Sequence, residues 1–138
     1  MKRKLSLALL IVLLCLNGCG KYSYSPVQPV ENVEKIEAFY WSNYSPYKYN
    51  DLLYVDADPI SVTHWDGFFP ALEQLPCHKY FHDPPQGVSD WVIRITYEDE
   101  SVELISASGC LYYNQDKWTE RYYYFDKDAF DTLIQSIL

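Results

Sequence analysis

The sequence predicts an α+β fold in which a mostly antiparallel sheet packs against two short helices. One C-terminal segment alternates apolar residues with the period of a strand, and three further strand-like segments follow it across polar turns. The final segment instead repeats apolar residues three and four positions apart, as in an amphipathic helix. In addition, 14 of the 138 residues are tyrosine, which favours strands. These observations favour an antiparallel meander with the last helix packed on one sheet face.

The meander is predicted from apolar alternation interrupted by polar turns. In its first strand the alternating residues are Trp91, Ile93, Ile95 and Tyr97. The polar segments 98–101 and 114–117 are typical of turns. The four predicted strands are residues 91–97, 102–105, 109–113 and 119–125.

Two helices are predicted from capping residues and apolar stripes. Asp126 can cap the last helix, and Asp66 can cap an earlier one over residues 66–75. Pro70 is compatible with that earlier helix only in its first turn. The stripe of the last helix is Phe130, Leu133, Ile134 and Ile137, and that of the earlier helix is Trp65, Phe68, Phe69, Leu72 and Leu75.

The first part of the domain reads as a strand, a loop and a hairpin. Residues 32–41 alternate as a strand, and residues 42–50 are rich in Ser, Asn and Tyr, as in a loop. The short apolar runs 52–55 and 60–63 flank the turn residues 56–59, which predicts a hairpin.

The N-terminus has the features of a signal peptide. Residues 2–4 are basic, and residues 5–16 are apolar apart from Ser6. A helix of that length spans roughly 18 Å, which is short for a bilayer core of about 30 Å.

The residues that end this segment, Leu16-Asn17-Gly18-Cys19, resemble the lipobox of bacterial lipoproteins. The resemblance implies cleavage between Gly18 and Cys19, with a diacylglyceryl group on the Cys19 sulfur. The domain would then be lipid-anchored to the bacterial cell membrane and face outside the cytoplasm. Gly20 is not Asp, so the inner-membrane retention signal of two-membrane cells is absent. An ordinary secreted protein and an uncleaved anchor are the alternatives.

The predicted domain organisation is a signal peptide over 1–18, a tether over 19–30 and a single domain over 31–138. Pro26 and Pro29 would stiffen the tether locally. Removing residues 1–18 leaves 8 basic and 19 acidic residues, a net charge of −11. That charge argues against nucleic acid as a partner and against binding anionic lipid by charge.

Cys77 and Cys110 are the cysteines that remain besides Cys19 after cleavage. An exported domain permits a disulfide between them, which would close about 33 residues and add roughly 3–4 kcal/mol. The alternative is two buried free thiols, since cysteine packs as a small hydrophobe.

Cys77, His78 and His82 form a cluster with zinc-ligand chemistry, followed by Asp83. No second pair of ligands is spaced to close such a site, and the flanking prolines indicate a loop or an edge strand. The competing interpretation is a set of polar residues near a turn, so neither a metal nor another cofactor is expected.

The sequence predicts a binding or interaction module and not an enzyme. It contains no nucleophile elbow, phosphate loop or zinc-protease motif. Tyrosines are concentrated at residues 40–54 and 122–125, where exposed rings could contact an envelope protein or a glycan. Alternatively, these tyrosines fill a thin core. A small envelope hydrolase is the other alternative and would need a buried polar pair in a cleft.

Overall fold

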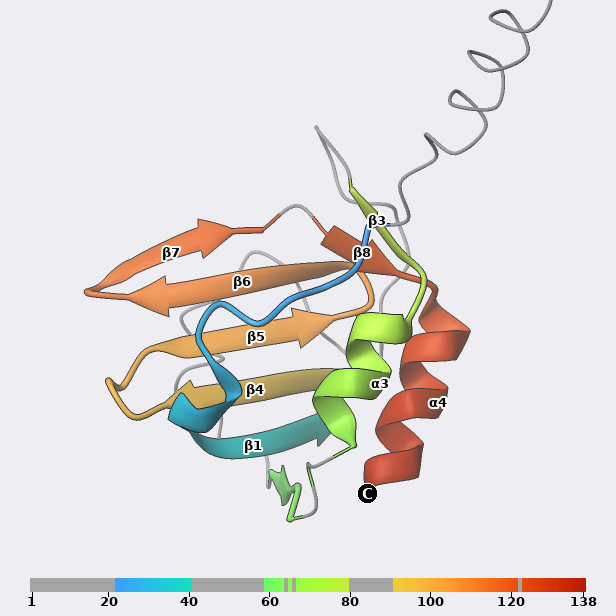
Figure 1. The fold of residues 1–138 in the computed structure, drawn as a ribbon, viewed down its shortest axis with the longest axis horizontal. Helices are drawn as coiled ribbons and strands as arrows, with labels where there is room; N and C mark the ends of the chain where they lie inside the picture. Colours follow the sequence, from blue (N-terminus) through green and yellow to red (C-terminus); the bar gives the residue numbers. More distant parts are fainter. Residues whose placement is uncertain (1–21, 41–58, 64, 66, 80–90, 122) are drawn as a thin grey trace, which may run out of the picture.

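The computed structural model describes residues 22–40, 59–63, 65, 67–79, 91–121 and 123–138. This part of the chain contains a six-stranded antiparallel sheet of order β2-β1-β4-β5-β6-β7 and a smaller sheet of β3 and β8 (Figure 1). The strands are β1 (Val33–Tyr40), β2 (Ile60–Ser61), β3 (Cys77–Lys79), β4 (Trp91–Tyr97), β5 (Val102–Ser106), β6 (Gly109–Asn114), β7 (Lys117–Glu120) and β8 (Tyr123–Phe125); the helices are η1 (Val30–Asn32), α3 (Phe68–Gln74) and α4 (Lys127–Ile137).

The predicted α+β class and the C-terminal meander are confirmed. Strands β4, β5, β6 and β7 follow one another in the sheet, each paired antiparallel with the next. The β6–β7 turn places Gln115 and Asp116 at positive φ, which a two-residue hairpin turn of this hand requires. A short local turn therefore sets the register of each neighbouring pair.

One predicted strand, residues 119–125, is wrong as a single element. β7 ends at Glu120, and β8 pairs with β3 instead of continuing along β6. The change of direction occurs at Arg121, whose backbone N–H still donates to the Cys110 carbonyl over 2.9 Å. Its side chain then enters the core and pairs with Glu103, so the chain leaves β6 at this residue.

The predicted first strand is confirmed as β1, which pairs antiparallel with β4. β2 lies on the other edge of β1, where Ile60 is opposite Ala38. The segment predicted to form a hairpin with it, residues 52–55, lies outside the described residues.

Both predicted helices form, but only one is capped as predicted. At α4, the Asp126 carboxylate accepts a hydrogen bond from the Ala129 N–H over 2.9 Å. At α3, the N-cap is Gly67 and not Asp66, and no side chain among the described residues caps this end. Pro70 is in the first turn of α3, where its missing N–H costs no helical hydrogen bond.

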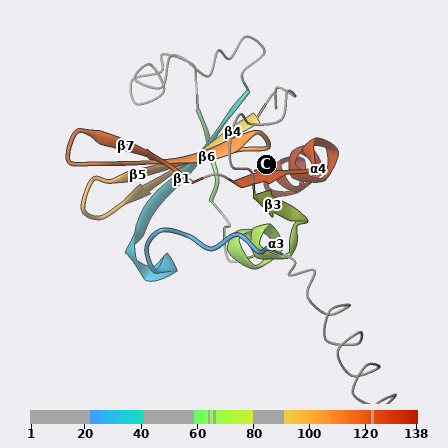
Figure 2. The same ribbon diagram turned by 90° about the horizontal axis from the view of Figure 1, so that it is seen from above.

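The main core lies between one face of the sheet and a layer that contains α3, α4 and the chain before η1 (Figure 2). Its buried members come from every one of these elements. They include Tyr24, Ile36, Phe68, Ile93, Tyr97 and Phe130. A second apolar cluster occupies the other face of the sheet and contains Phe39, Val92, Val102 and Leu104.

The tether predicted for residues 19–30 is corrected for the part that the structure describes. Residues 22–29, called the strap from here on, cross the sheet from β3 to η1 (Figure 1). Tyr24 in the strap is only 1% exposed and belongs to the main core. An amphipathic ring of this size gains free energy by burial, so the strap is part of the domain.

Candidate interaction surface

The strap is fixed to the domain along its length. Tyr22 forms an isolated antiparallel bridge with Cys77 at the start of β3. At the other end, the Gln28 side chain donates hydrogen bonds to Asp99 over 2.9 Å and to Ser101 over 2.8 Å. Asp99 in turn accepts from the backbone and hydroxyl of Ser101, which lowers the pKa of this carboxyl.

A buried carboxylate, Glu103, connects the strap to the sheet. Its side chain is completely buried and accepts from the Val27 N–H over 3.2 Å and from the Tyr97 hydroxyl over 2.8 Å. The Arg121 guanidinium, 2.5 Å from the other carboxylate oxygen, supplies the compensating charge. With these partners the buried charge is compensated. Removing one partner would leave an uncompensated buried charge and destabilise the fold.

The Tyr24 hydroxyl is buried close to the same carboxylate. Burial, followed by the negative charge of Glu103, raises the pKa of Tyr24 well above its ordinary value. Despite this proximity, the geometry of a hydrogen bond is not met, and the hydroxyl has no partner among the described residues. Tyr24 is therefore held by the packing of its ring, with the Arg121 guanidinium 5.5 Å from its centroid.

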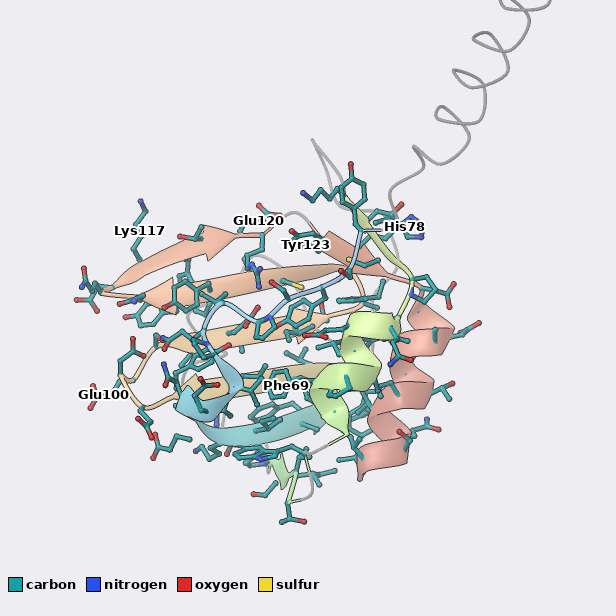
Figure 3. All side chains as sticks on the ribbon, viewed as in Figure 1. Phe69, His78, Glu100, Lys117, Glu120 and Tyr123 are labelled. Carbon is teal, nitrogen blue, oxygen red and sulfur yellow. The ribbon has the colours of Figure 1, made fainter. Side chains whose placement is uncertain are left out.

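Aromatic and cationic side chains meet where the strap begins, on β3 and β8. We call this group the β3–β8 edge. The Lys79 ammonium lies 4.7 Å from the Tyr22 ring centroid and 5.4 Å from that of Tyr123. On the other side of the strand pair, the His78 and Tyr124 rings stack with centroids 5.0 Å apart. The edge consists of Tyr22, His78, Lys79, Tyr123 and Tyr124, and Figure 3 labels His78 and Tyr123 on it.

The cysteines proposed for a disulfide are both buried and unbridged. Cys110 is 0% exposed near the start of β6, and Cys77 is 5% exposed at the start of β3. Burial raises the pKa of both thiols, and the charge of Glu103 raises that of Cys110 further. Their arrangement in the structure corresponds to the alternative of two buried free thiols.

The zinc interpretation receives no support from β3. Cys77 and His78 are neighbours on a strand and face opposite sides: the thiol is in the core, and the imidazole is exposed against Tyr124. The third candidate ligand, His82, lies outside the described residues, as does Cys19. Among the residues that the structure describes, no group of three or more His, Cys, Asp or Glu side chains could hold a metal ion.

An open cleft of about 330 Å³ lies between η1 and α3. This volume is at the lower end of the range of about 300–1,000 Å³ found for small-ligand sites. Apolar side chains form most of the wall, and one carboxylate lies at the rim. The lining residues are Val30, Trp65, Phe69, Pro70 and Glu73.

A second ion pair lies on the opposite face of the sheet. The Arg94 guanidinium donates to the Glu37 carboxylate from two nitrogens, over 2.8 and 2.9 Å. Lys35 lies 3.2 Å from the same carboxylate, and Arg94 also packs over the Phe39 ring. Glu37 and Arg94 are directly opposite on β1 and β4, so this pair ties these two neighbouring strands together.

The sequence contained a signal for the Glu103 site. Glu103 and Ile105 lie on the same side of β5, and Ile105 is in the main core. A charge at such an inward position requires a cation or several donors, which the alternation could have indicated. The sequence could not indicate that Arg121 is the partner. Arg121 reaches Glu103 only because the chain changes direction between β7 and β8.

Comparison of the chain with protein-family models, curated proteins and solved structures found no match. Among the described residues, no helix has the length and apolar character needed to cross a bilayer.

Proposed function

We propose that this protein is a lipid-anchored extracytoplasmic lipoprotein whose domain binds an envelope partner and catalyses no reaction. The proposed lipid anchor is supported by the position of the lipobox-like sequence, which ends just before the strap begins. Cleavage before Cys19 would keep Tyr22, Tyr24 and every other described residue. The processed chain would thus retain the described fold intact, with a diacyl group sufficient for stable membrane attachment.

The arrangement of charge supports binding over catalysis. A carboxylate can act as a general base, but that of Glu103 is 0% exposed and paired with Arg121. Its oxygens are already engaged by Arg121, Tyr97 and Val27. A substrate would have to displace these bonds to reach it, so the pair acts as a structural connection. The hydrolase alternative therefore lacks an accessible polar pair at this site.

The cleft between η1 and α3 is the surface we assign to the partner. Trp65 offers an aromatic ring, and Glu73 offers an acceptor for hydroxyl or amide protons. A ring beside an acceptor suits the face of a sugar or the apolar side chain of a protein. The partner is thus an envelope glycan or an envelope protein, and experiment distinguishes the two.

The anchor is tested by measuring the intact mass of the protein purified from cell membranes. We expect a diacylglyceryl-sized addition on an N-terminal Cys19. The Cys19→Ser variant should retain the signal peptide and lack the lipid. An unmodified Cys19 in the membrane-derived protein would contradict the proposal.

Partner binding is tested by sedimentation with purified cell-wall glycan and by cross-linking to membrane proteins in cells. We expect Trp65→Ala to reduce one of the two signals. The matched control is Ile60→Ala, which removes an apolar side chain that is 43% exposed and does not line the cleft. Circular dichroism checks that both variants keep the fold. Equal signals for Trp65→Ala and the wild type in both assays would remove the cleft from the proposal.

A further inference from the structure

The distance between the proposed anchor and the folded domain is limited by chain length. Only Gly20 and Lys21 separate Cys19 from Tyr22. Three residue steps of fully extended chain span at most about 11 Å. Tyr22 is fixed by its bridge to Cys77, which adds about 5 Å, so Cys19 lies within roughly 16 Å of the start of β3. A lipid on Cys19 would therefore bring β3 close to the headgroups.

The strap prevents the domain from moving away from that position. A flexible tether would require residues 22–29 to detach from the sheet. Detachment would expose the Tyr24 ring, which is 1% exposed, and would break the bond from the Val27 N–H to Glu103. The domain is consequently held with one particular edge towards the anchor.

That edge has the composition of a membrane interface. Tyr22 is 49% exposed, and its neighbour Lys79 is also exposed. Tyrosine is enriched at the headgroup level of membranes because its ring is apolar and its hydroxyl is polar. A lysine can place its stem along such rings while its ammonium reaches a phosphate.

One exposed acidic turn lies far from this edge. The exposed acidic turn Glu98–Glu100 lies at the far end of the sheet from β3 and β8 (Figure 3). Lys117 is also near that far end. It begins β7, and the four residues of this strand span roughly 13 Å towards β8. Repulsion between the acidic turn and an anionic headgroup layer favours an orientation with this turn away from the membrane, as the short anchor does.

We propose that the β3–β8 edge lies in the phospholipid headgroup layer, with the Lys79 ammonium at the lipid phosphates and the Tyr22 ring beside it. This inference rests on the proposed lipidation of Cys19. It adds a second contact between protein and membrane and fixes the orientation of the domain. The η1–α3 cleft is not part of this edge and stays available to a partner.

The test uses the full lipoprotein, purified from membranes, checked by intact mass and reconstituted into phospholipid vesicles. A thiol-reactive fluorophore is attached at Lys79→Cys or, as the matched control, at Lys117→Cys. The vesicles contain a lipid with a nitroxide on its headgroup, which quenches nearby fluorophores. The unsubstituted protein provides the labelling blank, because Cys77 and Cys110 are buried.

We expect stronger quenching at position 79 than at position 117, because β3 carries position 79 and lies next to the proposed anchor, whereas Lys117 lies at the far end of the sheet. With the fluorophore at His78→Cys in anionic vesicles, Lys79→Glu should reduce quenching and Lys117→Glu should not. Equal quenching at 79 and 117 in protein with a confirmed lipid would overturn this inference and leave the anchor standing. A mass without lipid would overturn the proposed function, and with it the distance bound on which the inference depends.

Discussion

Arg121 donates from Nη1 to the Glu103 carboxylate over 2.5 Å at a point where the glutamate side chain is fully buried and that of the arginine is 18% exposed. The pair connects the end of the meander to β5 and, through Val27, to the strap. Desolvating two charges is costly, so the net stability gained from this pair is small. Its main effect is to hold three segments in a fixed arrangement.

The Glu103–Arg121 pair predicts a strongly non-additive response to substitution. Glu103→Leu leaves Arg121 unpaired in the core and should lower the free energy of unfolding by about 3–5 kcal/mol. Adding Arg121→Met removes the uncompensated charge and should recover at least about 1 kcal/mol of that loss. Urea denaturation of the two single variants and the double variant measures the coupling. Additive losses would show that the two side chains are not energetically paired.

Tyr24 should tolerate loss of its hydroxyl but not of its ring. The hydroxyl is buried without a hydrogen bond among the described residues, so Tyr24→Phe should be neutral or stabilising by up to about 1 kcal/mol. Tyr24→Ala leaves a cavity under the strap and should cost about 3–5 kcal/mol. The measurement is urea denaturation, with protease cleavage of the N-terminus as a report on strap release. A large loss for Tyr24→Phe would indicate that the hydroxyl does bond to Glu103.

The meander and the last helix could be predicted from sequence because their determinants are local. Apolar alternation defined β4, turn residues defined its neighbours, and Asp126 defined the start of α4. The strap and the β3–β8 pair depend instead on long-range contacts. Val27 and Glu103 are 76 positions apart, and the pairing of His78 with Tyr124 has no local signal. The prolines in residues 20–30 suggested a tether. The burial of Tyr24 depends on residues far away in the sequence, so its neighbours gave no sign of it.

The β4–β5 turn contains a removable source of backbone strain. Glu100 has φ of 66°, in the left-handed region that favours glycine. Glu100→Gly should raise the free energy of unfolding by about 0.5–1 kcal/mol after the greater entropy of the unfolded glycine chain is included. Thermal denaturation should show a Tm increase of about 2–5 °C. Glu98→Gly is the matched control, since it removes the same charge at a residue without positive φ, and it should give no increase.

The state of Cys77 and Cys110 can be determined by counting thiols. Both are buried and unbridged in the structure, so neither should react with iodoacetamide in the native protein. After denaturation without reductant, both should be alkylated, which intact mass detects. Absence of labelling until a reductant is added would instead establish the disulfide that the exported location permits.

Stability should fall on the alkaline side of neutrality because several buried groups resist ionisation. Burial, followed by the charge of Glu103, raises the pKa values of Tyr24, Tyr97 and Cys110 in the folded state. In the unfolded chain these groups lose protons near pH 8.5 for cysteine and about 10 for tyrosine. The unfolded state therefore binds fewer protons above these values, so the free energy of unfolding is fully retained below about pH 8 and decreases as the pH rises. Urea midpoints at neutral and alkaline pH measure the decrease, and Tyr24→Phe should make it shallower. A midpoint that is constant or rises with pH would contradict the buried, un-ionised state of these groups.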